Sequence, residues 1–335
     1  MSELRHDPIQ HRWVIIATDR SKRPTDFLAE TAGIAEGAFC PFCPGHEDKT
    51  PPEITALRPD GSRPDTPGWS VRVIPNKFPA LMIEGGLDRK GMGIYDRMRG
   101  VGAHEVIVET PDHRATFATM GVDEVQRVLW AWRERISDLR RDTRLKSFLI
   151  VKNVGERAGA TLDHPHSQLL AMPLVPQHLE DELNGARAYH ELMERCVFCE
   201  VVEKELAAGE RIVGSDAETV AFTPFASRVP FETWVMMRGH QPAFDKLDDA
   251  ALTAVARRLR DTMQRLHGAL AAPPHTVLLH SAPVGEDDST SYDWHLEIVP
   301  RLLPVPGLAW DGGLHINPIS PEEAALELRS RGPEG

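Results

Sequence analysis

The 335-residue chain is 41% hydrophobic and 26% charged, the composition of an ordinary globular protein, and it is long enough for one bilobal unit or two similar domains. Its net charge of −12 argues against a nucleic-acid-binding surface. No run approaches the roughly 18 apolar residues that span a bilayer, and no apolar signal-peptide core follows Met1. We therefore expect a cytoplasmic protein that binds neither nucleic acid nor membrane, in which paired cysteines are metal ligands or redox groups.

The predicted elements recur in the same order in two halves of the chain. Each half begins with a Cys-x-Phe-Cys segment, followed by two strand-like runs, a helix with apolar residues at three- and four-residue steps, and two further strands. The elements are predicted at residues 40–43, 71–75, 105–109, 122–140, 147–151 and 164–171 in the first half, and at 196–199, 219–224, 233–237, 248–267, 276–280 and 294–299 in the second. Unless this recurrence is chance, it predicts an α+β fold of two repeats, residues 1–178 and 179–335, each an antiparallel sheet with one long packed helix.

A His-x-His-x-Gln run near the end of the first half carries the clearest chemical signal. Alternate residues of a strand share a face, so His164, His166 and Gln168 are predicted to point one way and Ser167 the other. A neutral imidazole can attack a phosphorus atom and leave again near pH 7, and a glutamine amide can donate to a phosphate oxygen. The run therefore indicates phosphate chemistry. The alternative is a surface turn that binds nothing.

The four cysteines of the chain form two Cys-x-x-Cys pairs, Cys40 with Cys43 and Cys196 with Cys199. Histidines follow each pair, and thiolates with imidazoles at this spacing favour tetrahedral zinc. A redox role for either pair is the alternative.

Several short segments occur in an order that is typical of one enzyme family. They are Asp19-Arg20-Ser21-Lys22-Arg23-Pro24, Cys40-Pro41-Phe42-Cys43, Pro75-Asn76-Lys77-Phe78-Pro79, Ala103-His104-Glu105-Val106-Ile107-Val108, Lys152-Asn153-Val154-Gly155, His164-Pro165-His166-Ser167-Gln168 and Ile316-Asn317-Pro318. With these segments the chain resembles the galactose-1-phosphate uridylyltransferases, a nucleotidyltransferase branch of the histidine-triad superfamily. The resemblance implies two histidine-triad-like repeats and a homodimer in which each site borrows residues from the second subunit.

The resemblance also implies roles for individual residues. His166 becomes the nucleophile that forms a uridylyl-histidine intermediate, His164 binds metal while its carbonyl orients His166, and Gln168 contacts the phosphate. The residues expected to contact substrate are Arg20, Arg23, Asn76, Asn153, Gly159, Thr161, Ser167, Asp311, Gly312 and Gly313. Two guanidinium groups at Arg20 and Arg23 suit a diphosphate, although a solvated basic turn is the plainer interpretation.

Two structural zinc ions are implied as cofactors. The expected ligands are Cys40, Cys43, His104 and His164 at the first site, and Cys196, Cys199, His240 and His295 at the second. His280 and Asp293 are further candidates for the second site, whereas His113 is expected at the surface or on a helix.

The leading functional prediction is galactose-1-phosphate uridylyltransferase activity, which moves UMP from UDP-glucose to galactose 1-phosphate by a ping-pong mechanism and yields UDP-galactose and glucose 1-phosphate. One alternative is an ADP-sugar phosphorylase with the same covalent histidine and inorganic phosphate as acceptor. The other is a zinc-stabilised nucleotide-binding protein without turnover. The segment 307–318 departs from the family pattern and leaves the sugar open.

Overall fold

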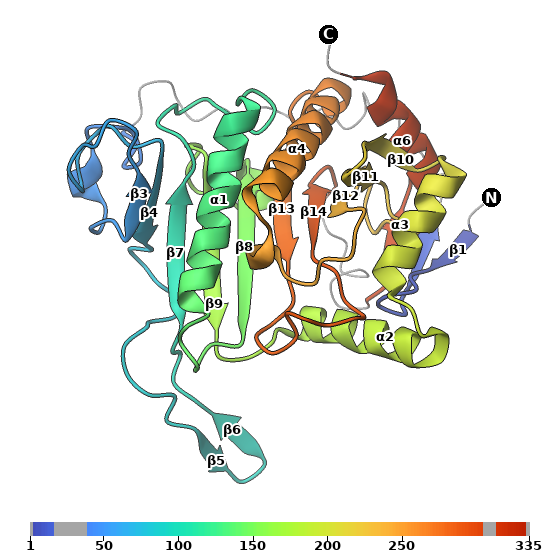
Figure 1. Ribbon diagram of the computed structural model, residues 1–335, viewed down its shortest axis with the longest axis horizontal. Coiled ribbons are helices and arrows are strands. Elements are labelled where there is room, and N and C mark those ends of the chain that lie inside the picture. The colour runs from blue at the N-terminus through green and yellow to red at the C-terminus, as the bar shows by residue number, and fades with distance from the viewer. Residues whose placement is uncertain (1–2, 17–38, 304–312, 333–335) are drawn as a thin grey trace.

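The computed structural model describes residues 3–16, 39–303 and 313–332. Ten strands form one sheet in which every neighbouring pair is antiparallel (Figure 1). From one edge to the other they are β10 (Ile212–Ser215), β11 (Thr219–Phe222), β12 (Thr233–Met237), β14 (His295–Pro300), β13 (His275–His280), β8 (Ser147–Val154), β9 (His166–Met172), β7 (Ala103–Val108), β4 (Val71–Pro75) and β3 (Thr55–Leu57).

The strand order confirms the two predicted repeats. Outward from the centre, the order is β8-β9-β7-β4-β3 in the first half and β13-β14-β12-β11-β10 in the second. In both halves this is the fourth, fifth, third, second and first of the five sheet strands in chain order. The halves meet where β8 pairs with β13, from Ile150 opposite Leu279 to Val154 opposite His275. The boundary predicted between residues 178 and 179 lies in the first turn of the helix after β9 and stays a prediction.

One long helix from each half covers the same face of the sheet (Figure 1). These are α1 (Val122–Leu139) and α4 (Asp249–Leu270), which also contact each other. An acidic side chain caps the start of each helix: Glu124 accepts from the Gly121 N–H, and Asp248 accepts from the Ala251 N–H as N-cap. Their apolar faces join both halves of the sheet in a single hydrophobic core.

The opposite face of the sheet differs between the halves. In the second half, α2 (Gln177–Met193) and α3 (Val197–Ala208) pack against it and form a second core with strands β11 and β12. In the first half, this face carries a small apolar cluster of Trp69, Ile74, Val106 and Val108, with Phe42 packed beside it. Within the described ranges, one face of the first repeat is therefore less covered than its counterpart in the second.

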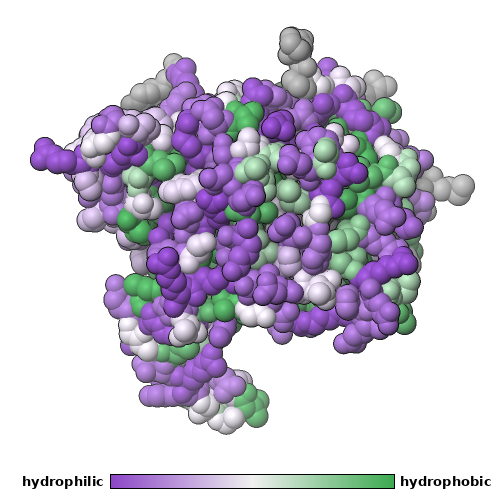
Figure 2. All heavy atoms as spheres, viewed as in Figure 1, coloured by the Kyte–Doolittle hydropathy of each residue, from purple (hydrophilic) through white to green (hydrophobic). Residues whose placement is uncertain are grey.

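Smaller elements complete the described chain. They are a three-stranded sheet of β1 (Glu3–His6), β2 (Trp13–Ile16) and β15 (His315–Asn317), the helix α6 (Pro321–Ser330), the 3-10 turns η3 (Glu47–Lys49), η4 (Glu156–Ala158) and η5 (Phe244–Lys246), and a hairpin of β5 (Lys90–Met92) and β6 (Tyr95–Arg97). The hairpin projects from the body, and apolar surface shows at its end (Figure 2). No helix within the described ranges has the length and apolarity that a bilayer span requires.

Candidate active site and metal centres

Strand β9 presents its residues alternately to the two faces of the sheet. His166, Gln168 and Leu170 are half-buried on the less covered face, whereas Ser167 and Leu169 are fully buried toward α1. The Trp132 Nε1–H donates to Ser167 Oγ at 2.8 Å. The prediction that His166 and Gln168 share a face is confirmed. The Ser167 side chain is committed to the core, so only its backbone remains for substrate.

The His166 ring is held in one orientation. Its Nδ1–H donates to the His164 carbonyl at 2.8 Å, which leaves the lone pair on Nε2 for a reacting phosphorus. Burial lowers the pKa of His166, and the Lys152 charge acts in the same direction. The Phe42 ring packs edge-on 5.3 Å from the imidazole. The sheet therefore presents a neutral imidazole whose Nε2 has no hydrogen-bond partner among the described residues, which is what a nucleophile near pH 7 requires.

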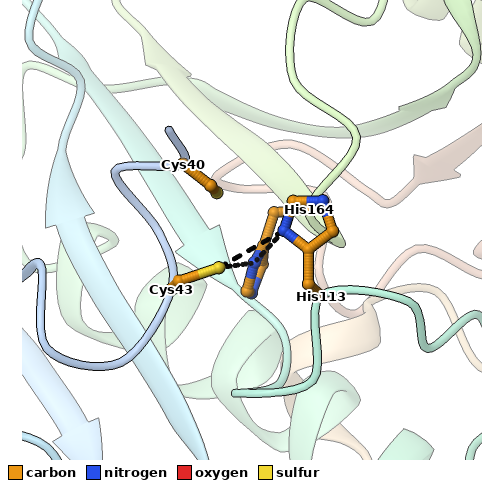
Figure 3. Close-up of side chains that lie close together, drawn as sticks. All are labelled: Cys40, Cys43, His113 and His164. Atoms are coloured by element: carbon orange, nitrogen blue, oxygen red, sulfur yellow. Dashed lines mark hydrogen bonds between the residues drawn. The ribbon is translucent and has the colours of Figure 1, made fainter. Parts of the chain in front are cut away.

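The first cluster of potential metal ligands contains a residue that was expected at the surface or on a helix. Ligand atoms of Cys40, Cys43, His113 and His164 all lie within 4.8 Å of one another (Figure 3). Cys43 Sγ lies 3.3 Å from His113 Nδ1 and 3.6 Å from His164 Nδ1. His164 Nε2–H donates to the Thr110 carbonyl at 2.8 Å, so its Nδ1 lone pair faces the cluster.

His104 was predicted as the fourth ligand of this site, and the structure places it elsewhere. It lies opposite Leu170 in the β7–β9 pair, whereas the cluster forms where Val108 meets His166, four residues further along β7. At about 3.3 Å per residue that is roughly 13 Å away. His113, in the turn Pro111-Asp112-His113 that follows β7, occupies the position instead. Its place just beyond the strand end was the available signal.

The donor set at the first site fits a zinc ion. Two thiols and two imidazoles make a tetrahedral Cys2His2 set. Burial, together with the neighbouring Cys40 thiol, raises the pKa of Cys43 to about 11. Because that proton must leave before Cys43 can act as a ligand, a bound cation would supply the charge that burial disfavours.

The second site repeats the pattern with a carboxylate. Ligand atoms of Cys196, Cys199, His240 and Asp293 lie within 4.8 Å of one another. Asp293 Oδ2 lies 3.2 Å from Cys196 Sγ and 3.1 Å from Cys199 Sγ, and Asp293 Oδ1 lies 2.9 Å from His240 Nδ1. The Cys196 thiol and the Asp293 carboxylate raise the pKa of Cys199, a repulsion that a divalent cation would remove. The set Cys2HisAsp suits zinc.

His295 was predicted as a ligand here, and the structure assigns that place to Asp293, one of the two further candidates. The His295 ring is fully buried and stacks between Trp234, at 4.5 Å, and His280, at 4.6 Å. Asp293 lies two residues earlier, just before β14 begins, and reaches the cysteines from there. His280, the other candidate, bonds to Glu182 instead.

A third group of potential ligands lies between α2 and the strands β13 and β14. His178, Glu182, His280 and Glu297 lie within 4.8 Å of one another. Burial opposes the charges of Glu182 and His280, yet each stabilises the other: His280 lowers the pKa of Glu182 to about 2, and Glu182 raises that of His280. Arg228 Nη2 lies 2.5 Å from Glu297. Cations of the protein itself thus counter these carboxylates.

Some of the remaining residues predicted to contact substrate lie within the described ranges. Asn76 is half-buried beside His104, with its Nδ2 atom 3.1 Å from the ring Nε2. Gly159 ends η4 with a φ of +87°, which glycine adopts without strain, and a Cβ there would lie 3.8 Å from Asn153 Nδ2. Thr161 is exposed in the same loop. Gly313 is exposed, and Arg20, Arg23, Asp311 and Gly312 lie outside the described residues.

Proteins with named activities resemble this chain over nearly its whole length. An ADP-glucose phosphorylase of Arabidopsis thaliana is 32% identical over 333 residues, covering 98% of this chain and 92% of the relative. A galactose-1-phosphate uridylyltransferase of Thermotoga maritima is 27% identical over 340 residues and covers 98% of each. A crystal structure of an Arabidopsis thaliana ADP-glucose phosphorylase with bound ADP-glucose superimposes with a TM-score of 0.82 at 30% identity, covering 98% of this chain and 99% of that one. The chain is accordingly an enzyme of the nucleotidyltransferase class.

The sequence match is also specific at the level of the family. Residues 1–176 match the family described as "Galactose-1-phosphate uridyl transferase, N-terminal domain". The chain belongs to the galactose-1-phosphate uridylyltransferase family.

Proposed function

We propose that this enzyme transfers a nucleoside monophosphate from a nucleotide-diphosphate sugar to a phosphate acceptor through a covalent nucleotidyl-His166 intermediate. The observation that carries the proposal is the bond from His166 Nδ1–H to the His164 carbonyl, which leaves Nε2 free on the less covered face of the sheet. A binding protein without turnover has no need of such a nitrogen, which argues against the non-catalytic alternative.

In the first step, Nε2 of His166 attacks the α-phosphorus. The bond between that phosphorus and the bridging oxygen breaks, and the sugar 1-phosphate leaves with the electron pair. In the second step, an acceptor phosphate oxygen attacks the same phosphorus and His166 departs as neutral imidazole. The Gln168 amide N–H stabilises the charge that builds on the non-bridging oxygens in both steps.

The relatives divide over the donor and the acceptor. The 32% identity to an ADP-glucose phosphorylase, compared with 27% to a uridylyltransferase, puts an ADP-sugar donor and an inorganic phosphate acceptor first. Transfer of UMP from UDP-glucose to galactose 1-phosphate is the second candidate, supported by the family match over residues 1–176.

Two zinc ions would complete the structure of the site. Each cluster offers four ligand atoms, which leaves no coordination position for water, so both ions would be structural. At the first site, the Cys40–Cys43 segment (the metal knuckle) that would bind the ion also places Phe42 against the proposed nucleophile. The ion would thus hold the wall of the site in place.

We also propose that the protein is a homodimer. The hairpin of β5 and β6 exposes Met92, Ile94 and Tyr95 at 57%, 90% and 71% of their surfaces, and an isolated hairpin is only marginally stable in water. A second copy of the chain would cover this surface. Light scattering of the wild type and of Ile94→Asp tests the contact: a monomeric wild type contradicts it.

Intact mass spectrometry after brief mixing with ADP-glucose or UDP-glucose, without acceptor, tests the covalent step. A gain of one AMP supports the first candidate and a gain of one UMP supports the second. His166→Ala is expected to give no adduct and to lower turnover at least about 10³-fold. His190→Ala serves as the matched control, because that histidine lies on α2 in the second repeat and outside the three ligand clusters. Absence of any adduct in wild-type protein contradicts the proposal.

A further inference from the structure

The Gln168 side chain can help or hinder the reaction depending on which way its amide points. Its Nε2 group donates hydrogen bonds and suits an anionic phosphate, whereas its Oε1 atom accepts them and repels one. The amide is half-buried and joined to the strand by rotatable bonds, so another group has to fix its orientation.

His104 is placed to fix it, and its own tautomer is determined by the backbone. The Ala80 N–H donates to His104 Nδ1 at 3.1 Å, so Nδ1 carries a lone pair and the ring proton lies on Nε2. His104 Nε2 lies 2.8 Å from Gln168 Oε1. Because Nε2 is the donor, its partner has to be the oxygen of the amide.

The neighbouring asparagine does not compete for that proton. Asn76 Oδ1 accepts from the Phe78 N–H at 2.9 Å, so the Asn76 atom nearest to His104, 3.1 Å away, is the donor Nδ2. Two donors do not bond to each other. The His104 proton is therefore left to Gln168, and no acceptor among the described residues takes the Asn76 amide N–H.

The strand register shows where this leaves the donor end of Gln168. On β9, Gln168 lies between His166, which is opposite Val108, and Leu170, which is opposite His104. His104 thus draws Oε1 toward the side away from His166. The Nε2 group, at the other end of the planar amide, lies on the side of the nucleophile.

We propose that His104 is a positioning residue that fixes the Gln168 amide with its N–H groups toward the phosphate attacked by His166. The inference rests on the proposed nucleotidyl transfer and adds a residue to it. It also gives a role to the histidine that the structure excludes from the metal cluster. Through the Ala80 N–H, the chain segment at the base of the β5–β6 hairpin is connected to the same amide.

The test compares His104→Phe, Gln168→Ala and the double variant. His104→Phe retains an aromatic ring and removes both nitrogens. We expect kcat for adduct formation to fall about 10- to 100-fold, less than for Gln168→Ala, with KM within about threefold, since loss of an oxyanion donor costs roughly 10²–10³-fold. In the Gln168→Ala background, His104→Phe is expected to have no further effect, because His104 acts only through that amide.

His104→Gln, which restores a side-chain N–H donor, is expected to recover part of the rate. The zinc content of His104→Phe, measured on the same samples, is expected to equal that of the wild type.

Loss of one zinc equivalent, a wild-type rate, or multiplicative effects in the double variant would each overturn the role of His104. These outcomes are distinct from failure of the proposed function, which would appear as a wild-type enzyme that forms no adduct.

Discussion

Strand β9 of the first repeat and strand β14 of the second hold equivalent places in the sheet but have different surroundings. At the junction of the repeats Val151 pairs with Leu278, and their neighbours on the next strands outward are Gln168 and Glu297. Gln168 on β9 and Glu297 on β14 therefore occupy equivalent positions in the two repeats. By the same register His166 corresponds to His295. In the part of the first repeat that the structure describes, the histidine lies on a partly open face and its Nε2 has no hydrogen-bond partner. In the second, α2 covers the face and the histidine is fully buried.

The polar residues around the two strands also differ between the repeats. His164 corresponds to Asp293, and each lies in a metal cluster two residues before its strand histidine. His104, which bonds to Gln168, corresponds to Glu232. There Arg228 bridges Glu232 and Glu297, with Nη2 at 2.6 and 2.5 Å. The duplicated scaffold therefore has a cluster of potential metal ligands in each repeat, while one strand end carries the proposed nucleophile and the other a buried ion network.

Exchanging the residue type between the repeats should have its largest effect at Gln168. Gln168→Glu places the acidic residue of the second repeat beside the phosphate, where a carboxylate repels the building charge. We expect adduct formation to slow at least 10²- to 10³-fold in rapid-mixing mass spectrometry, with an unchanged unfolding temperature. Gln177→Glu, the same exchange at an exposed position on α2, should leave the rate unchanged. Equal rates in the two variants would contradict the assignment of Gln168.

The reverse exchange should affect stability instead of catalysis. Glu297→Gln removes one carboxylate from the buried network, although Arg228 keeps Glu232 as a partner. We expect a loss of about 3 kcal/mol in the free energy of unfolding by urea titration, and adduct formation that is unchanged below the transition.

Glu218→Gln, on the surface, is the control and should lie within about 0.5 kcal/mol of the wild type. A slow but stable Glu297→Gln enzyme would mean that the second repeat takes part in the chemistry.

Loss of the two metal knuckles, Cys40–Cys43 and Cys196–Cys199, should affect activity differently. Cys43→Ser and Cys199→Ser are each expected to lower the zinc content by one equivalent and to lower the unfolding temperature. Only Cys43→Ser should also slow adduct formation, by about 10- to 100-fold, because its knuckle carries Phe42 and His164 beside the nucleophile. Metal analysis and rapid mixing on both variants test this. Equal slowing would show that neither knuckle has a special relation to the site.

The smallest expected effect concerns acid stability in the second repeat. Burial lowers the pKa of His267 to about 4 and that of His275 to about 3. Between about pH 6.5 and these values the unfolded chain binds protons that the folded one does not, so these groups lower stability as the pH falls. His267→Phe removes one of them. Between pH 7 and pH 5.5, the free energy of unfolding of this variant should fall by about 1 kcal/mol less than that of the wild type, measured by urea titration.

Much of the fold was predictable because the signals are local. The paired Cys-x-Phe-Cys segments and the apolar periodicity of α1 and α4 are both visible within short windows of sequence. The pairing of β8 with β13 was not predicted. It joins residues more than a hundred positions apart, and no local pattern specifies which strands meet at the centre of a sheet.

The candidate site was predicted where strand alternation and the family resemblance agree, at His164, His166 and Gln168. The predicted ligand sets differ from the observed clusters where a potential ligand comes from a turn. His113 follows β7 by five residues and Asp293 precedes β14 by two, and the path of such turns is fixed by tertiary contacts. His104 and His295 are regular strand residues whose side chains the sheet directs elsewhere.

The pairing of β8 with β13 determines whether either repeat can fold and stay soluble by itself. Each repeat shields the other's innermost strand, whose Val and Leu residues would make an exposed edge in an isolated half. A fragment that ended after β9 would present β8 as a template for other chains and aggregate. Two fragments produced together would instead reassemble across the same line of hydrogen bonds, so the junction that binds the repeats also makes neither of them a free-standing module.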